Sequence, residues 1–175
     1  IAGITPTLPP SLMQHTFGRG EYIPLSPNVL WQIEFGIVRS LAWNDEGKQS
    51  TLGLWSKGDI IGEPLSNINP YEAECMTSVT VSVLPSSLWY NAFDAIFAHI
   101  QQAEELLHIL HCDPIHLRLR LLLCWLAEKF GDDTLHGRLI SLKVLRKCSG
   151  LWMKAIQQQN LPCSSAKLTR DSANA

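Results

Sequence analysis

The stretch Met76–Leu110, MTSVTVSVLPSSLWYNAFDAIFAHIQQAEELLHIL, decides the fold because the spacing of its apolar residues changes partway along. Up to Leu84, valine and threonine alternate with serine and threonine, the period of two expected for a strand with one buried face. From Phe93 onward, apolar residues recur at spacings of three and four, which is the period of a helix. A strand followed by a long helix is therefore predicted here, and Ser86 or Ser87 is expected to cap the helix start.

The helical half carries a narrow apolar stripe that is typical of a seam between two helices. Its spacings of 3, 4, 3, 4 and 3 form an a/d pattern over nearly three heptads. The alternative is an amphipathic helix packed on its own domain, but such a helix usually has a wider apolar face. We favour the seam, and the predicted dimer interface consists of Phe93, Ile96, Ile100, Ala103, Leu107 and Leu110.

Upstream, short β-rich segments alternate with turn residues from Phe17 onward. The predicted strands are Leu30–Ile33, Ile37–Trp43, Ser50–Trp55 and Met76–Leu84. The connection Asn44–Gly47 has the composition of a hairpin turn with glycine in the left-handed position. Strands at intervals of about eight to twelve residues, with no helix predicted between them, indicate a sandwich or roll.

Downstream, Asp113–Pro114 is predicted to interrupt the helix, because proline lacks a backbone donor and clashes with the preceding turn. This makes the dipeptide a hinge. Ile115–Phe130 predicts a second helix, apolar almost all round its middle and therefore expected to be buried between elements. Gly137–Leu142 predicts a short extended segment.

The composition indicates a globular protein of a reducing compartment. The 175 residues are 46% hydrophobic and 17% charged, which is enough apolar material for a core. No apolar run approaches membrane-spanning length and the first ten residues lack the pattern of a signal peptide, so we expect a cytoplasmic protein with no membrane contact. The five scattered cysteines contain no CxxC pair, which argues against a disulfide framework or a zinc knuckle.

The net charge of -2 conceals an asymmetry between the two parts of the chain. Residues 1–114 carry 4 Lys/Arg and 12 Asp/Glu, whereas residues 115–175 carry 10 Lys/Arg and 4 Asp/Glu. A basic C-terminal part gains affinity for nucleic acid by displacing the counterions of phosphates. The asymmetry favours nucleic acid as a partner.

Three passages, taken in order, carry a recognisable pattern. Gly58–Leu65 reads GDIIGEPL, and Thr77–Val81 forms part of the strand that follows. Leu119–Gly131 is followed by Gly137–Leu142. Over about residues 17–142 this order resembles the Crp/Fnr superfamily of bacterial transcription regulators, in which GDxxGExxL precedes a strand, a long helix and a helix-turn-helix. The resemblance is greatest to a cyanobacterial branch.

The resemblance implies an α+β fold in three parts. These are a jelly-roll-like β-roll sensor (1–88), a dimerisation helix (89–112) and a small, helical, winged-helix-like DNA-binding domain (113–175), although no wing is recognised after Leu161. It implies a homodimeric regulator that responds to an effector or is constitutive, with double-stranded DNA and RNA polymerase as partners. The alternative is a sensor or adaptor dimer that has lost specific DNA binding.

The family's effector pocket corresponds to Ile61, Gly62, Glu63 and Leu65. In members that bind cyclic nucleotides, an arginine after the Gly-Glu pair neutralises the phosphate. Here residues 64–74 contain no arginine or lysine, and Glu72 and Glu74 would repel a phosphate that they faced. Because a phosphate without a cationic partner is costly to bind, we expect no cyclic nucleotide and no cofactor; a 2-oxoglutarate effector is disfavoured for the same reason.

The reading helix is left open among three registers. In the preferred register Gly150 is the turn glycine and Leu151–Gln159 is the reading helix, although Arg146 then takes a position where a small residue is usual. A second register continues from Leu142 without gaps, and a third begins the reading helix at Thr169. The candidate DNA-contacting residues are Lys143, Arg146, Lys147, Lys154, Gln157 and Gln158. The basic side chains suit phosphates or guanine, and the glutamines suit adenine edges.

Catalytic and metal chemistry are disfavoured. His108, His111 and Cys112 share one helix face and His116 follows, but we interpret this cluster as hinge and interface residues rather than metal ligands. The chain contains no GxSxG, Walker, GxGxxG or HExxH motif. A cupin-like metal enzyme would need histidines on its strands, and residues 17–84 contain none. We therefore expect a protein that is not an enzyme.

Overall fold

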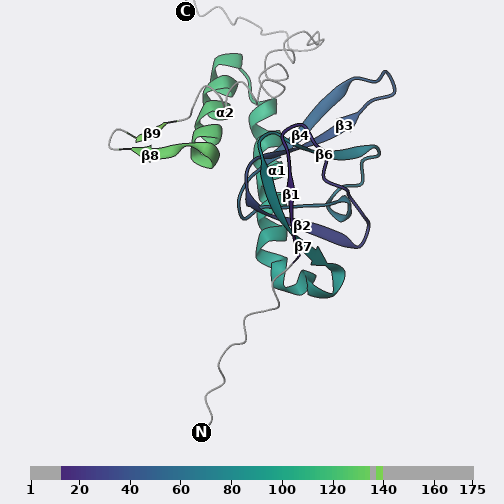
Figure 1. The fold of residues 1–175 in the computed structure, drawn as a ribbon. Coiled ribbons are helices and arrows are strands. Elements are labelled where there is room, and N and C mark those ends of the chain that lie inside the picture. The colour runs from purple at the N-terminus through teal and green to yellow at the C-terminus, as the bar shows by residue number, and fades with distance from the viewer. Residues whose placement is uncertain (1–12, 135–136, 140–175) are drawn as a thin grey trace, which may run out of the picture.

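The computed structural model describes residues 13–134 and 137–139, which form a β-roll followed by two helices and a small hairpin (Figure 1). One sheet has the strand order β1-β7-β2-β5 and a second has the order β4-β3-β6, with antiparallel pairing throughout. The strands are β1 (Gln14–Phe17), β2 (Val29–Phe35), β3 (Val38–Trp43), β4 (Gln49–Trp55), β5 (Ile60–Ile61), β6 (Tyr71–Cys75) and β7 (Val79–Pro85). The α+β fold class predicted from the sequence is confirmed.

The core of the roll forms where the inner faces of the two sheets meet. The first sheet contributes buried Trp31, Ile33, Val79 and Val81, and the second contributes Val38, Trp55, Ala73 and Cys75. The alternation predicted for β7 is observed at Val79 and Val81, which are fully buried. Ser82 departs from the pattern: it is buried and its hydroxyl donates to Glu34 Oε1 at 2.8 Å.

Two helices stand side by side next to the roll (Figure 1). A 3-10 helix, η2 (Ser86–Ala92), leads into α1 (Phe93–His111), and α2 (Ile115–Phe130) follows after a three-residue break. The hairpin of β8 (Asp132–Thr134) and β9 (Gly137–Leu139) points away from the roll in Figure 1. The predicted break at Asp113–Pro114 and the predicted bounds of α2 are confirmed.

Several details of the sequence prediction are wrong. Strand β6 was not predicted, and β7 begins at Val79 rather than at Met76. Helix α1 begins at Phe93 with no side-chain hydrogen bond at its start, so neither Ser86 nor Ser87 caps it. The middle of α2 is not buried all round, because Leu123 and Cys124 are exposed.

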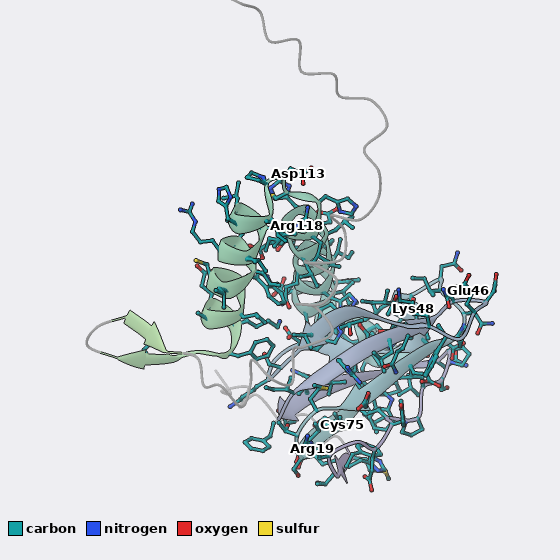
Figure 2. The ribbon with its side chains drawn as sticks, turned by 90° about the horizontal axis from the view of Figure 1, so that it is seen from above. Arg19, Glu46, Lys48, Cys75, Asp113 and Arg118 are labelled. Atoms are coloured by element: carbon teal, nitrogen blue, oxygen red, sulfur yellow. The ribbon has the colours of Figure 1, made fainter. Side chains whose placement is uncertain are left out.

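The hairpin between β3 and β4 follows the predicted turn chemistry. Gly47 adopts a φ of 74°, a conformation that residues with a Cβ rarely take. The backbone amide of Lys48 donates to the side-chain oxygen of Asn44 at 2.7 Å and closes the turn. Figure 2 shows Glu46 and Lys48 at the tip of this hairpin, away from the helices.

Within the described ranges, no helix has the length and apolar character needed to span a membrane.

Candidate functional site

Helix α1 carries an apolar face that its own chain leaves uncovered. Phe93, Phe97, Ile100 and Leu107 expose 56%, 59%, 47% and 58% of their surface, and Ala103 between them is also exposed. These five residues recur at spacings of three and four, so they lie along one side of the helix. We call them the α1 face.

The opposite side of α1 packs on the chain's own core. Ile96 lies against the buried cluster of Leu30, Ile60, Leu84 and Ala92. Leu110 is only 8% exposed and packs in a cluster formed with α2. Of the six predicted interface residues, Phe93, Ile100, Ala103 and Leu107 therefore lie on the α1 face, whereas Ile96 and Leu110 lie inward. The sequence pattern did not identify Phe97 as a main member of this face.

The break between the helices is held by a buried arginine. The side chain of Arg118, in the first turn of α2, is 4% exposed. Its Nε donates to the carbonyl oxygen of Cys112 at 2.9 Å, and its Nη2 forms an ion pair with Asp113 Oδ1 at 3.0 Å. Figure 2 shows Asp113 and Arg118 together where the two helices meet. Arg118 thus satisfies a carbonyl group at the end of α1 that has no partner within that helix.

The histidine cluster near this break is not arranged as a metal site. His108 Nε2 lies 3.9 Å from Cys112 Sγ, but His111 directs Nδ1 to the carbonyl oxygen of Leu107 at 2.8 Å. No group of three or more potential ligands is close enough to hold a metal in the part of the chain that the structure describes.

A cleft of about 540 Å³ opens beside the segment that resembles the family's effector pocket. That volume is in the usual range for small-molecule sites. It is lined by Tyr22, Ile23, Leu25, Glu63, Ser66, Asn67, Ile68, Asn69, Pro70, Tyr71, Glu72 and Ala73. Glu63 begins the 3-10 helix η1 (Glu63–Leu65), Tyr71 and Glu72 lie on β6, and the loop between these elements contributes Ser66, Asn67 and Asn69.

Only one of the four predicted pocket residues lines this cleft. Glu63 does so, with its side chain exposed. Ile61 is fully buried in the core of the roll, and Leu65 packs towards the η2 side of the molecule. Gly62 is needed for packing, because a Cβ there would lie 2.9 Å from the carbonyl oxygen of Val29.

The cleft is acidic. Glu63 and Glu72 line it, and among the residues that the structure describes no lysine or arginine does. Desolvation, followed by the carboxylates of Glu74 and Glu72, raises the pKa of Tyr22 above its ordinary value. A nearby cation, Arg39, is held by Glu74, with Nη2 and Oε2 2.7 Å apart. An anionic ligand in this cleft would therefore face carboxylates, and the nearby guanidinium of Arg39 is already paired with Glu74.

Helix α1 contributes a histidine to the interior of the roll. The ring of His99, from α1, stacks on Trp55 with centroids 3.9 Å apart, and its Nδ1 lies 3.0 Å from the carbonyl oxygen of Ile60. Trp55 Nε1 donates to Ser40 Oγ at 3.0 Å. Among the described residues, no buried side-chain nitrogen or oxygen lacks a hydrogen-bond partner. No pattern in the sequence indicated this contact between His99 and Trp55.

The candidate DNA-contacting residues lie outside the described residues. These are Lys143, Arg146, Lys147, Lys154, Gln157 and Gln158.

The β-roll, the long helix with an uncovered apolar face and the second helix together form an arrangement that solved structures share. The solved structures with this fold include a CRP-family transcriptional regulator of Thermus thermophilus, with a TM-score of 0.61 and 20% identity over 82% of this chain and 83% of that one. FixK2 of Bradyrhizobium japonicum has a TM-score of 0.61 and 17% identity over 89% of each chain. At these identities the likeness concerns the fold.

A curated relative gives the closer sequence match. The regulatory protein CysR of Synechococcus elongatus is 37% identical over 142 residues, which are 80% of this chain and 68% of the relative. No protein-family model matches the chain. The chain belongs to the Crp/Fnr family of transcriptional regulators, and its similarity to a cyanobacterial member agrees with the branch predicted from the sequence.

Proposed function

We propose that this protein is a DNA-binding transcription regulator that acts as a homodimer through the α1 face. The observation that carries the proposal is the uncovered stripe of Phe93, Phe97, Ile100, Ala103 and Leu107 on a helix whose other side is buried. Large apolar side chains aligned along a helix usually mark an interface. A second copy of the chain is the proposed partner because Phe93, Ile100 and Leu107 recur every seven residues, and the same face of two copies can pair across a twofold axis.

The proposal places DNA binding in the basic C-terminal part of the chain. Residues 115–175 carry a net charge of +6, from 10 Lys/Arg and 4 Asp/Glu, and include Lys143, Arg146, Lys147 and Lys154. Two copies in a dimer would present these four side chains to half-sites about one DNA turn apart. A cytoplasmic location and contact with RNA polymerase belong to the same proposal.

The acidic cleft is the proposed effector site, and its chemistry disfavours cyclic nucleotides. Glu63 and Glu72 can accept hydrogen bonds from hydroxyl or amino groups, whereas a phosphate would need a cationic partner. We therefore propose a neutral or cationic effector, if one is used, and no resident cofactor.

The dependence of DNA affinity on salt tests the proposal. If the four cations of Lys143, Arg146, Lys147 and Lys154 in each copy contact one phosphate each, the slope of log affinity against log salt is about -7. We expect a slope of this order in anisotropy titrations of a random duplex between about 50 and 200 mM salt. A Lys147→Ala variant should reduce its magnitude by about 2. Absence of binding at the lowest salt would overturn the regulator proposal and leave the sensor or adaptor dimer.

A further inference from the structure

The last turn of α2 holds a buried lysine that reaches across to the roll. Lys129 Nζ lies 2.6 Å from Asp59 Oδ2, and the two side chains are only 11% and 10% exposed. Asp59 belongs to the turn between β4 and β5, seventy residues earlier in the chain. The ion pair therefore joins the roll to the last turn of α2, which precedes the candidate DNA-contacting residues in the chain.

The ammonium group of Lys129 is enclosed by aromatic rings from both sides of this joint. It lies 5.7 Å from the ring centroid of Trp55 in β4, 5.9 Å from that of Trp125 and 6.0 Å from that of Phe130. These distances fall within the range of cation–π attraction. The contact with Trp55 adds a second link between α2 and the roll.

Helix α1 supplies a third partner. Lys129 Nζ donates to Gln102 Oε1, while Gln102 Nε2 donates to Asp59 Oδ1 at 2.9 Å. Gln102 thus satisfies both members of the ion pair at once. The joint contains groups from the roll, α1 and α2, the three elements that must move relative to one another if a signal passes from the sensor to the C-terminal part.

Asp59 is fixed rigidly to the roll. Its Oδ2 accepts from the backbone amide of Ser56 at 2.7 Å, and its carbonyl oxygen accepts from the amide of Ile33 in β2 at 2.9 Å. A movement of this turn would therefore carry the carboxylate with it. The carbonyl oxygen of the next residue, Ile60, lies 3.0 Å from Nδ1 of His99 in α1. Asp59 and Ile60 therefore contact both α1 and α2.

A buried ion pair of this kind favours one geometry strongly. Leu54 packs in one apolar cluster with Leu122 and Leu126 of α2, but apolar packing of this kind tolerates rearrangement. Separating two buried charges leaves each without compensation and is far more costly. Removing one partner of this pair should therefore destabilise the docked position of α2 more than removing both partners together.

We propose that Lys129 and Asp59 form a latch that fixes α2 to the roll, and that displacement of the Ser56–Asp59 turn releases α2 and reorients the chain beyond Phe130. The mechanical part of this proposal is independent of the function proposed above. Only its consequence for DNA binding rests on that function.

Hydrogen exchange on the full-length protein, followed by mass spectrometry, tests the latch. We expect Asp59→Asn and Lys129→Met each to raise exchange at residues 115–130 by at least about tenfold, with strands β2 and β7 unchanged. The double variant Asp59→Asn/Lys129→Met should recover much of the protection, because neither uncompensated charge remains. Arg39→Met is the matched control, since it removes an ion pair of similar burial that lies wholly within the roll.

Gln102→Met keeps both charges and removes only the bridging amide, so it tests the latch even if the single charge variants do not fold. It should raise exchange at α2 several-fold. Unchanged exchange at α2 would overturn the latch. An equal rise in β2, β7 and α2 would also overturn it, because the ion pair would then contribute only to the global stability of the protein. The affinity for duplex DNA, measured on the same proteins, should change in the single variants and recover in the double variant. If the unmodified protein binds no DNA, the regulator proposal fails, but the exchange result still decides the latch.

Discussion

The double substitution Ile100→Glu/Leu107→Glu is expected to convert a dimer into a monomer. Full burial of an Ile or Leu side chain contributes about 1.5–3 kcal/mol. Leu107 is 58% exposed and Ile100 47% exposed, so covering what remains would contribute about 1–1.7 and 0.7–1.4 kcal/mol respectively. Each contact occurs twice in a symmetric dimer, which gives about 3–6 kcal/mol in total. The dissociation constant should therefore rise about a hundredfold to ten-thousandfold, before any repulsion between the new carboxylates.

Sedimentation velocity over a concentration series measures this change. The unmodified protein should sediment as a dimer at micromolar concentration, and the double variant as a monomer with unchanged circular dichroism. Phe35→Glu is the matched control, because Phe35 is 63% exposed but lies on the roll rather than on α1. A double variant that remains dimeric, or a control that dissociates equally, would refute the assignment of the α1 face.

Three further predictions concern His99, the cysteines and Gly62. Desolvation lowers the pKa of His99, so the unfolded chain binds its proton more readily; the free energy of unfolding should decrease as the pH falls below about 6.5, by at most about 1.4 kcal/mol per pH unit. Urea titrations between about pH 7.5 and 5.5 should show this slope and its loss in His99→Gln, and an equal slope in the variant would exclude His99 as the cause. Burial raises the pKa of Cys75 to about 11, so iodoacetamide at about pH 8 should modify exposed Cys124 and spare Cys75 until denaturant is added, as peptide mass spectrometry can verify. Gly62→Ala should lower the free energy of unfolding by about 1–3 kcal/mol because its Cβ would meet backbone, whereas Gly18→Ala, whose nearest neighbour is a side chain at 3.4 Å, should change it little; equal losses would contradict this packing argument.

The elements with a clear period were predictable from the sequence. The alternation before Leu84 identified β7, and the spacing of three and four identified α1, because each pattern records which side chains face an apolar layer. The break at Asp113–Pro114 followed from the chemistry of proline. The strand, the helix and the break each depend on residues that are close together in the sequence, so a local pattern is enough to predict them.

Strand β6 was missed although its pattern is also regular. Ala73 and Cys75 face the core, whereas Glu72 and Glu74 face outward, so the segment has a period of two. Its two glutamates obscured that signal, because acidic residues are uncommon in strands. The outward position of Glu74 is stabilised by Arg39 on β3, a contact between strands that are distant in the sequence.

The contacts that join the roll to the helices could not be predicted. The pattern did not show which side of α1 faces the roll, because buried His99 is polar and exposed Phe97 is apolar. The position of His99 depends on Trp55, which stacks on its ring. Likewise, Lys129 contributed to the basic charge of the C-terminal part in the sequence, whereas in the structure Asp59 and three aromatic rings enclose it.

The stoichiometry of the complex with DNA tests the central claim most directly. Sedimentation of the full-length protein with a fluorescent random duplex of about 40 base pairs, at about 50 mM salt, reports both DNA binding and the number of chains bound. A dimeric regulator predicts a complex that contains two chains per duplex at the lowest protein concentration that gives binding, and loss of that complex in Ile100→Glu/Leu107→Glu. A duplex that sediments as free DNA, or a stable complex with a single chain, would contradict the account.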